Sequence, residues 1–415
     1  QGGKTLKQIA DLHIHSRYSM ATSRDGTPEM LDLWARKKGI TILGTGDMTH
    51  PAWRKELKEK LIPAEQGLFR LKDEYILPEA ADYPGKPPRF VLSGEISSIY
   101  KKGGKTRKVH SLILLPGFDE ADAFAARLEK IGNIHSDGRP ILGLPCRDLL
   151  EIMLDVSEEG MYIPAHIWTP HFSLFGAKSG FDTIEECFEE LTPYIHALET
   201  GLSSDPMMNW QISALDGYQL VSHSDAHSPS KLGREANLMD IEFSYRELWD
   251  AVQKGEGLEG TIEFFPEEGK YHFDGHRKCG VCLSPKEAEK YNGICPVCGK
   301  KLTMGVDHRI LQLSDRDAGA AAMPESGRPY ESLVPLPEVV SACVGFSIAS
   351  KKVQGQYEML LEKLGAEFQV LREVPLEDIR TTGGDALAEG IRRLRAGEVI
   401  RKPGFDGEYG KIELF

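Results

Sequence analysis

Pairs of histidines and carboxylates recur in this chain at a spacing that lets two side chains hold one metal ion. His13 and His15 form one such pair, in a segment whose polar and apolar residues alternate from 11 to 15. The alternation predicts a strand that points both imidazoles to one face, with their Cα atoms about 6–7 Å apart. Asp225 and His227 repeat the spacing. One pair alone is weak evidence, because such pairs are more often polar residues without a metal.

Further residues of metal-ligating type accompany these pairs. They are Asp47, His50, Glu95, His110 and His166. Asp47, His50 and Glu95 lie at the ends of predicted strands, His110 lies at the start of another, and His166 follows Pro164-Ala165. All are near βα junctions, and in a βα barrel the edge where strands end is where sites are built. The whole set therefore predicts a cluster of divalent ions held by nitrogen and oxygen ligands.

Clustered divalent ions favour hydrolysis of a phosphoester. Two ions a few ångströms apart can lower the pKa of a shared water and hold a phosphate oxygen. Asp225 is the candidate ligand nearest the attacking water. Arg17, directly after the HxHS segment, could neutralise a phosphate. The alternative for Arg17 is an ordinary place on a helix surface.

Four cysteines form a second and chemically different candidate metal site. Cys279-x2-Cys282 is followed, after twelve residues, by Cys295-x2-Cys298. Two such pairs can complete a tetrahedral zinc site, and four thiolates leave no open position, so this zinc would be structural. The gap is slightly shorter than the usual 15–20 residues. A redox pair is the alternative, while His276, just before the cysteines, could contact phosphate or be solvated.

The cysteine module is locally basic. Arg277, Lys278, Lys300 and Lys301 flank the cysteines. Small zinc modules with a basic surface often contact nucleic acid. The alternative is a set of lysines and arginines that only keep the surface solvated.

The amino-acid composition limits the classes of protein to which the chain can belong. The chain has 415 residues, 27% charged and 40% hydrophobic, with a net charge of −13. The negative net charge excludes a protein that coats nucleic acid with a uniformly basic surface, but it does not exclude a local basic patch. Apolar runs stay short of the about 18 residues that a membrane helix needs, and no secretory leader is recognisable. Seven cysteines without an even framework argue against disulfides, so we expect a reducing cytoplasm.

Three parts follow one another along the chain. Residues 1–265 alternate predicted strands and helices, which favours an α/β barrel. Residues 266–318 are rich in Gly, Lys and Cys and carry the four-cysteine module. Residues 319–415 are predicted to be mainly helical, with a terminal hairpin around Asp406-Gly407.

Several motifs of the first part resemble those of the polymerase and histidinol phosphatase (PHP) superfamily. They are Asp11-Leu12-His13-Ile14-His15-Ser16, Gly94-Glu95, His110, Pro164-Ala165-His166 and Ser224-Asp225-Ala226-His227. The resemblance implies a distorted seven-stranded barrel that binds up to three ions at one mouth. It implies one ion on His13, His15, Glu95 and Asp225, and a second on Glu95, His110 and His166. A third would use His227 with Asp47 or His50, because the segment 45–50 departs from the usual Thr-Asp-His.

The whole length resembles the endonuclease Q branch of that superfamily. The motifs are Gly44–Asp47, Ile163–Pro170, Ala197–Leu202, Gly260–Pro266 and the four-cysteine module. The resemblance implies a repair endonuclease that uses metal-activated water to cut DNA 5′ of deaminated bases (uracil, hypoxanthine, xanthine) and abasic sites. The implied partner is damaged DNA, and the implied location is the cytoplasm, at the nucleoid. The barrel ions would be Zn²⁺, with Mg²⁺ or Mn²⁺ as alternatives.

Catalysis is assigned on this basis to Asp225, Glu95, His13 and His15. An enzyme that reads a damaged base needs a pocket for the extruded nucleotide. Trp168 and Phe172, in the loop after His166, could stack against it, although a core position is an alternative for either. Two other functions stay open: a PHP phosphatase acting on a small phosphomonoester, and a DNA-binding protein without catalysis.

Overall fold

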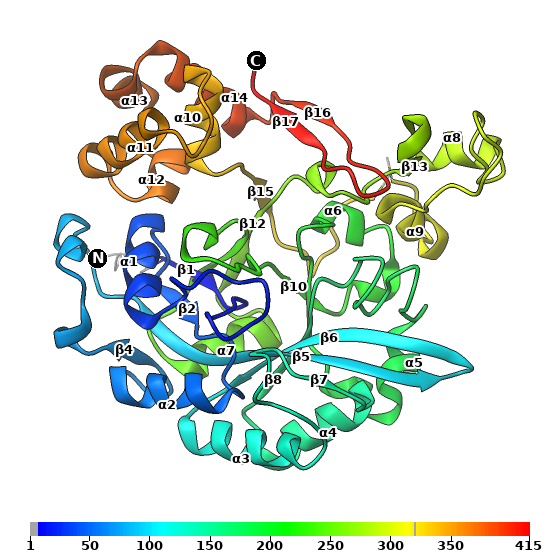
Figure 1. Ribbon diagram of the computed structural model, residues 1–415, viewed down its shortest axis with the longest axis horizontal. Helices are drawn as coiled ribbons and strands as arrows, with labels where there is room; N and C mark the ends of the chain where they lie inside the picture. Colours follow the sequence, from blue (N-terminus) through cyan, green and yellow to red (C-terminus); the bar gives the residue numbers. More distant parts are fainter. Residues whose placement is uncertain (1–6, 319–320) are drawn as a thin grey trace.

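A mixed sheet runs through the centre of the molecule, with helices outside it and a helical C-terminal region above it (Figure 1). This is a computed structural model that describes residues 7–318 and 321–415. The sheet contains β1 (Lys7–Asp11), β2 (Ile42–Gly44), β3 (Leu61–Pro63), β4 (Phe69–Leu71), β5 (Arg89–Lys102), β6 (Lys105–Leu115), β7 (Ile141–Leu142), β8 (Met161–Pro164), β11 (Ala236–Asp240), β12 (Leu258–Glu263) and β15 (Tyr330–Ser332).

Strand directions bring the chemistry-bearing loops to one edge. β1 runs parallel to β2, and β2 runs parallel to β5. β5 and β6 form an antiparallel hairpin, and β8 lies antiparallel to β6. β9 (Ala197–Glu199) and β10 (Gln219–Val221) form a separate parallel pair. The segments that follow β1, β2, β8 and β10 therefore carry the predicted ligands together.

The strands enclose a common apolar core. One buried cluster takes side chains from β1, β2, β5, β6, β8, β9, β10 and β11, together with α7 (Tyr245–Lys254). Ala10, Ile42, Val91 and Ile163 are fully buried there. Alternate residues of a strand point to opposite faces: Leu112 and Leu114 of β6 belong to this core, while Ile113 and Leu115 pack in a second buried cluster on the other face.

The outer helices of the first part are α1 (Pro28–Lys38), α2 (Pro51–Lys60), α3 (Phe118–Glu129), α4 (Cys146–Val156), α5 (Ile184–Phe188) and α6 (Pro206–Asn209). Helix α1 shows why the sequence marks its ends. The Thr27 side chain accepts a hydrogen bond from the amide of Met30, and Gly39 ends the helix at φ 90°. A cap, a proline at the first turn and a left-handed glycine together define such a helix.

One predicted strand lies earlier in the chain than expected. The alternation from Asp11 to His15 predicts a continuous strand, but β1 ends at Asp11. Beyond it, Ile14 makes a single bridge to Ala226. His13 and His15 thus lie on the segment past the end of β1, on either side of the bridging Ile14.

The second part is a small module to one side of the central sheet (Figure 1). It contains the hairpin of β13 (Asp274–His276) and β14 (Val281–Leu283), followed by α8 (Pro285–Lys290) and α9 (Val306–Leu313). The chain then returns to the sheet, where β15 pairs in parallel with β12.

The C-terminal region is helical, as predicted. Its elements are α10 (Leu336–Val344), α11 (Lys351–Leu364), α12 (Glu367–Arg372), α13 (Leu376–Gly383), α14 (Asp385–Ala396), β16 (Ile400–Lys402) and β17 (Lys411–Glu413). A buried ion pair of 3.1 Å between Lys38 and Glu367 ties it to α1. The predicted terminal hairpin is present, and Asp406 in its loop accepts hydrogen bonds from the Arg277 amide and the Thr303 hydroxyl, both at 2.7 Å. No helix among the described residues is long and apolar enough to cross a membrane.

Candidate metal centre

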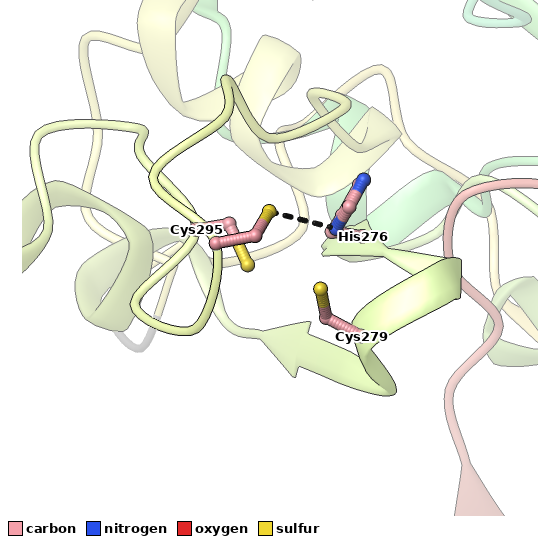
Figure 2. Close-up of side chains that lie close together, drawn as sticks. His276, Cys279 and Cys295 are labelled. Carbon is pink, nitrogen blue, oxygen red and sulfur yellow. Dashed lines mark hydrogen bonds between the residues drawn. The ribbon is translucent and has the colours of Figure 1, made fainter.

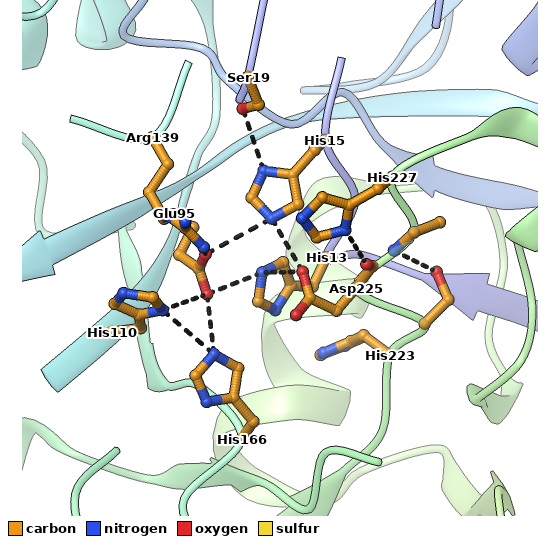
Figure 3. Close-up of polar contacts among 12 residues, drawn as sticks. His13, His15, Ser19, Glu95, His110, Arg139, His166, His223, Asp225 and His227 are labelled. Carbon is orange, nitrogen blue, oxygen red and sulfur yellow. Dashed lines mark hydrogen bonds and ion pairs between the residues drawn. The ribbon is translucent and has the colours of Figure 1, made fainter. Parts of the chain in front are cut away.

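Two ligand groups meet at the sheet edge and share one carboxylate. His13, His15, Glu95 and Asp225 bring one ligand atom each within 4.8 Å of one another, and so do Glu95, His110 and His166. Figure 3 shows these side chains converging from β5, β6 and the loops after β1, β8 and β10. The structure thus brings together seven of the nine nitrogen- or oxygen-ligand candidates singled out from the sequence, if His227 beside His15 is included.

The first group is close-packed around Asp225. Its Oδ1 lies 2.8 Å from Nε2 of His15 and 3.3 Å from Nε2 of His13. Glu95 Oε2 lies 3.0 Å from Nε2 of His13. Yet His13 Nε2 and Glu95 Oε2 are both buried without a hydrogen-bond partner. Buried nitrogen and oxygen atoms that face each other unpaired fit a divalent cation between them.

The second group places two imidazoles against the same carboxylate. His166 Nε2 lies 3.3 Å and His110 Nδ1 lies 3.5 Å from Glu95 Oε2. The two histidine nitrogens are 3.2 Å apart. Glu95 is therefore the one side chain shared by both groups, in the position of a bridging ligand.

Neighbouring histidines keep the carboxylates of Glu95 and Asp225 ionised. Burial by itself raises the pKa of Glu95, but His13 and His110 outweigh it and lower the pKa well below its ordinary value. The pKa of Asp225 is likewise lowered, because His13 and His15 overcome its burial. For His110, burial dominates and lowers the pKa to about 4. Ionised carboxylates and a neutral imidazole are the protonation states that bind metal ions.

Backbone strain gathers at the same place. Asp47, His166 and Asp225 have φ of 48°, 28° and 50°, in the left-handed region that residues other than glycine rarely adopt. Gly46 has φ 62°, and a Cβ there would lie 2.3 Å from the carbonyl oxygen of Ile14. Such strained positions persist where the surrounding structure fixes them, as at functional sites.

The predicted third site is not assembled as expected. His50 is not available as a ligand, because its Nδ1 accepts from the amide of Ala52 at 3.2 Å and its Nε2 contacts the carbonyl of His135 at 2.9 Å. It caps the start of α2 instead. Asp47 accepts from the Ser16 amide at 2.8 Å and lies 3.4 Å from His15 Nδ1, so it orients a ligand. Sequence spacing could not separate a cap or an orienting carboxylate from a ligand.

His227 lies beside the centre rather than within either ligand group. Its ring centroid is 4.6 Å from that of His15, and its Nδ1 lies 2.8 Å from the carbonyl oxygen of Asp225.

The structure places two of the predicted DNA-contacting residues away from the ligand groups. Arg17 points to Glu56, whose carboxylate it meets at 2.8 Å, and not into the ligand groups. Trp168 is a core residue: it is 1% exposed, and its indole donates to Asn209 at 2.8 Å. Phe172 remains accessible, with its ring 4.7 Å from that of His110.

Arg139 is a site residue that the sequence did not reveal. Its Nη1 donates to Glu95 at 3.0 Å, and its Nε is buried without a partner (Figure 3). The preceding Asp137 fixes the loop by accepting from the amides of Met20 and Arg139, at 3.2 and 3.0 Å. This loop between α3 and β7 has no motif, so only the fold brings it to the site.

Glu199 is a second missed residue. It is fully buried at the end of β9 and lies 2.9 Å from Nδ1 of His13 and 2.7 Å from Nδ1 of His223. Burial raises its pKa, but His13 and His223 prevail and lower it to about 2. The available sequence evidence was its place in Ala197–Leu202, one of the motifs that resemble the endonuclease Q branch.

The cysteine module contains a further ligand group with a different composition from the one predicted. His276, Cys279, Cys295 and Cys298 lie within 4.8 Å of one another (Figure 2). Cys282 is not in this group. The basic residues Arg277, Lys278, Lys300 and Lys301 are all exposed around it.

Solved structures identify the family. The chain is similar to the crystal structure of the lesion-specific endonuclease PfuEndoQ from Pyrococcus furiosus, with a TM-score of 0.85, 30% identity, and coverage of 98% of this chain and 95% of that one. The chain belongs to the endonuclease Q family. An endonuclease Q complex with a 27-mer duplex carrying an abasic lesion at its active site matches equally well, with TM-score 0.84, 30% identity and coverage of 98% and 96%.

Sequence relatives agree with this membership. The endonuclease Q chain described here is 29% identical to YqxK of Bacillus subtilis, over 98% of this chain and all of that protein. It is 32% identical to MJ0043 of Methanocaldococcus jannaschii over 63% of this chain, and the match spans only 34% of that longer protein. A family model of the MJ0043 C-terminal domain matches residues 335–398. The resemblance seen in the sequence motifs is confirmed.

Proposed function

We propose that the chain is a DNA endonuclease that hydrolyses the phosphodiester 5′ of deaminated bases (uracil, hypoxanthine, xanthine) and of abasic sites. The observation that carries this proposal is the paired ligand group around Glu95, in a chain of the endonuclease Q family. The solved relatives are described as a lesion-specific endonuclease and as a complex with an abasic duplex.

Two divalent ions fit the ligand groups. His13, His15, Glu95 and Asp225 would hold one, and Glu95, His110 and His166 the other. The mixed nitrogen and oxygen donors suit Zn²⁺ or Mn²⁺, and the histidines disfavour Mg²⁺. Such ions supply Lewis acidity and neutralise charge on the phosphate. A third ion at Asp47 would require this carboxylate to release the amide and hydroxyl of Ser16 from which it accepts.

The protein's own groups would orient the substrate. Arg139 presents a guanidinium at the edge of the centre, where it can pair with a phosphate oxygen of the scissile bond. Asp225, held between two imidazoles, keeps a carboxylate oxygen at the middle of the first group. Both charges are fixed by folding, so little reorganisation is needed when the phosphodiester is attacked.

Phe172 is the candidate for contact with the extruded nucleotide. Its backbone has φ 62°, and it is held by a bond from the His110 amide to its carbonyl oxygen, 3.1 Å, and one from its amide to Ser179, 3.2 Å. Lys108 lies 5.3 Å from the ring centre. An aromatic ring in a fixed place next to a ligand suits stacking on a base or sugar.

Lesion choice would follow from one hydrogen-bond pattern. Deamination replaces an exocyclic amine by a carbonyl, so backbone N–H donors in a pocket would accept uracil, hypoxanthine and xanthine together. Cytosine and adenine carry an exocyclic amine at this position, so the backbone N–H donors of the pocket would face another donor and stay unpaired. An abasic site costs less to extrude, so it would be cut without a base contact.

Along the chain we propose a PHP-type barrel of seven strands, β1, β2, β5, β6, β8, β9 and β10, within residues 1–265. Residues 266–318 would form the zinc module, whose Arg277, Lys278, Lys300 and Lys301 contact DNA phosphates. Residues 319–415 would form the helical part. We expect the protein to act in the cytoplasm, on nucleoid DNA.

A matched set of labelled duplexes tests the function. The duplexes carry uracil, hypoxanthine, xanthine, an abasic site, a T·G mismatch or no lesion, and product length on a denaturing gel gives the cut position. We expect cutting 5′ of each lesion and none of the other two duplexes, with Asp225→Asn as the inactive control. Equal cutting of T·G and uracil duplexes would refute the base pocket. No DNA cutting, with turnover of a small phosphomonoester, would favour the phosphatase.

A further inference from the structure

The ligand group of the cysteine module contains a histidine in place of one predicted cysteine. We propose that zinc in this module is held by His276, Cys279, Cys295 and Cys298, and that Cys282 is a free thiol. Nδ1 of His276 lies 3.5 Å from Sγ of Cys298, and the four ligand atoms lie within 4.8 Å of one another (Figure 2). Three sulfurs and one imidazole nitrogen are a common closed zinc set.

The β13–β14 hairpin explains why Cys282 cannot replace His276. His276 pairs with Val281, and Gly275 pairs with Cys282. Paired residues of an antiparallel hairpin share a face, and neighbours along a strand point to opposite faces. His276 and Val281 are therefore on one face and Cys282 on the other. Val281 packs with Cys295 in the buried cluster of the module, so the metal lies on the face of His276.

The sequence contains two matching turns once His276 is counted. His276-x2-Cys279-Gly280 and Cys295-x2-Cys298-Gly299 have the same pattern. Both glycines adopt left-handed backbone, with φ 63° and 71°. The amide of Gly280 donates to the carbonyl of Arg277, three residues back, at 3.0 Å, and that of Gly299 to the carbonyl of Cys295, four residues back, at 2.9 Å. The two turns close differently, but each places its two candidate ligands one and four residues before a glycine.

The spacing supports the same assignment. Between Cys279 and Cys295 there are fifteen residues, 280–294. Counted from Cys282 the gap is twelve, which is shorter than the about 15–20 usual between two such turns. The irregular gap of the four-cysteine interpretation disappears when the first turn begins at His276.

This ligand set has an electrostatic consequence. Replacing a thiolate by a neutral imidazole makes the metal centre one unit less negative than a four-thiolate centre. Arg277 and Lys278 lie between the ligands of the first turn, and Lys300 and Lys301 follow the second. The exposed surface around the metal is therefore more positive than four thiolates would allow.

Thiol labelling in the intact protein gives the first test, and it does not depend on nuclease activity. Zinc-loaded protein is treated with iodoacetamide, and each cysteine is quantified by mass spectrometry. We expect Cys282 to be labelled while Cys279, Cys295 and Cys298 are protected, and all four to be labelled after chelation. Cys343, partly buried and outside the module, reports general access. Protection of Cys282 that is lost on chelation would overturn the proposal.

Paired variants give the second test. We expect Cys282→Ser to keep all of its zinc and its melting temperature, and His276→Ala to lose about one equivalent of zinc per chain with a lower melting temperature. His276→Cys should restore both, because it keeps four ligands. The opposite pattern, loss of zinc in Cys282→Ser and retention in His276→Ala, would establish the four-cysteine site instead. Zinc is counted by elemental analysis, and the barrel ligands are unchanged in every variant.

Discussion

The carboxylate of Glu199 lies 2.9 Å from Nδ1 of His13, and both side chains are completely buried. A carboxylate at Nδ1 fixes the proton on that nitrogen, so the lone pair of Nε2 points to Glu95 and Asp225. Glu199 also accepts from the backbone amide of His166 at 2.9 Å. One side chain thereby orients residues of both ligand groups.

We predict that Glu199→Gln weakens metal binding by about 10–100-fold, the usual cost of losing a carboxylate behind a histidine ligand. The amide keeps the shape but not the charge. The measurement is cleavage rate against metal concentration, together with direct metal titration. Added metal should restore most of the rate. Exposed Glu185→Gln is the matched control, and an unchanged metal dependence of Glu199→Gln would show that the contact has no such role.

We predict that Asp225→Asn lowers cleavage by more than about 100-fold while the fold and DNA binding persist. The substitution keeps the size of the side chain and removes the charge that lies 2.8 Å from His15 and 3.3 Å from His13. Single-turnover rates and duplex binding are measured on the same preparation. Near-normal turnover would place the catalytic centre elsewhere.

We predict that Arg139→Ala lowers kcat by about 10²–10³-fold, as expected for loss of one donor to a reacting group. Arg139→Lys should recover only part of the lost rate, because lysine keeps the positive charge but lacks the planar set of N–H donors of the guanidinium. Arg17→Ala should cost less, since that guanidinium is paired with Glu56. Arg246→Ala, on an exposed ion pair of α7, controls for loss of a surface charge. Equal effects of Arg17→Ala and Arg139→Ala would contradict the assignment.

We predict opposite consequences for the two aromatic candidates. Trp168→Ala should lower the free energy of unfolding by about 3–5 kcal/mol, because it removes a buried side chain. Phe172→Ala should leave stability nearly unchanged and weaken binding of lesion-containing DNA by about 1–3 kcal/mol. Denaturant unfolding and duplex titration separate the two. A destabilised Phe172→Ala with normal DNA affinity would make Phe172 a packing residue.

We predict that stability falls as pH rises from about 4 to 7, in part because of Asp205. Burial raises the pKa of this side chain to about 7, with Glu263 and Glu267 adding to the effect. Its unfolded value is about 4. The folded state therefore holds the proton more tightly, and this contribution, present below pH 4, is lost as the pH passes 7.

Asp205→Asn should remove that part of the slope, because an amide does not ionise. It can still accept the α6 capping bond from Met208. At pH 8 we expect the variant to be more stable than the parent by about 1–4 kcal/mol. Denaturation midpoints from pH 4 to 8 measure this, and parallel curves for the two proteins would refute the assignment.

The sequence predicted much of the fold because local patterns mark element ends. Thr27, Pro28 and Gly39 bound α1 as expected, and Asp406-Gly407 lies in the terminal hairpin loop. The end of β1 was missed, because alternation continues to His15 although strand pairing stops at Asp11. The alternation of polar and apolar residues indicates to which face each side chain points. It does not indicate whether a neighbouring strand is present to pair with the segment.

The sequence by itself determined which residues can ligate metals, and all six residues of the two ligand groups have i, i+2 spacing or belong to a family motif. The tertiary structure decided which of the candidates face a common point. In the folded chain His50 caps the start of α2 and Trp168 lies in the core. Cys282 lies on the face of the β13–β14 hairpin opposite to that of His276. The tertiary structure also brought Arg139 to the centre from a loop without a motif, and Glu199 from the end of β9. The type of ligand atom is a property of each residue, so it can be read directly from the sequence. Convergence depends on strand direction, register and the hydrogen bonds that orient each ring, and these arise only when distant segments pack together.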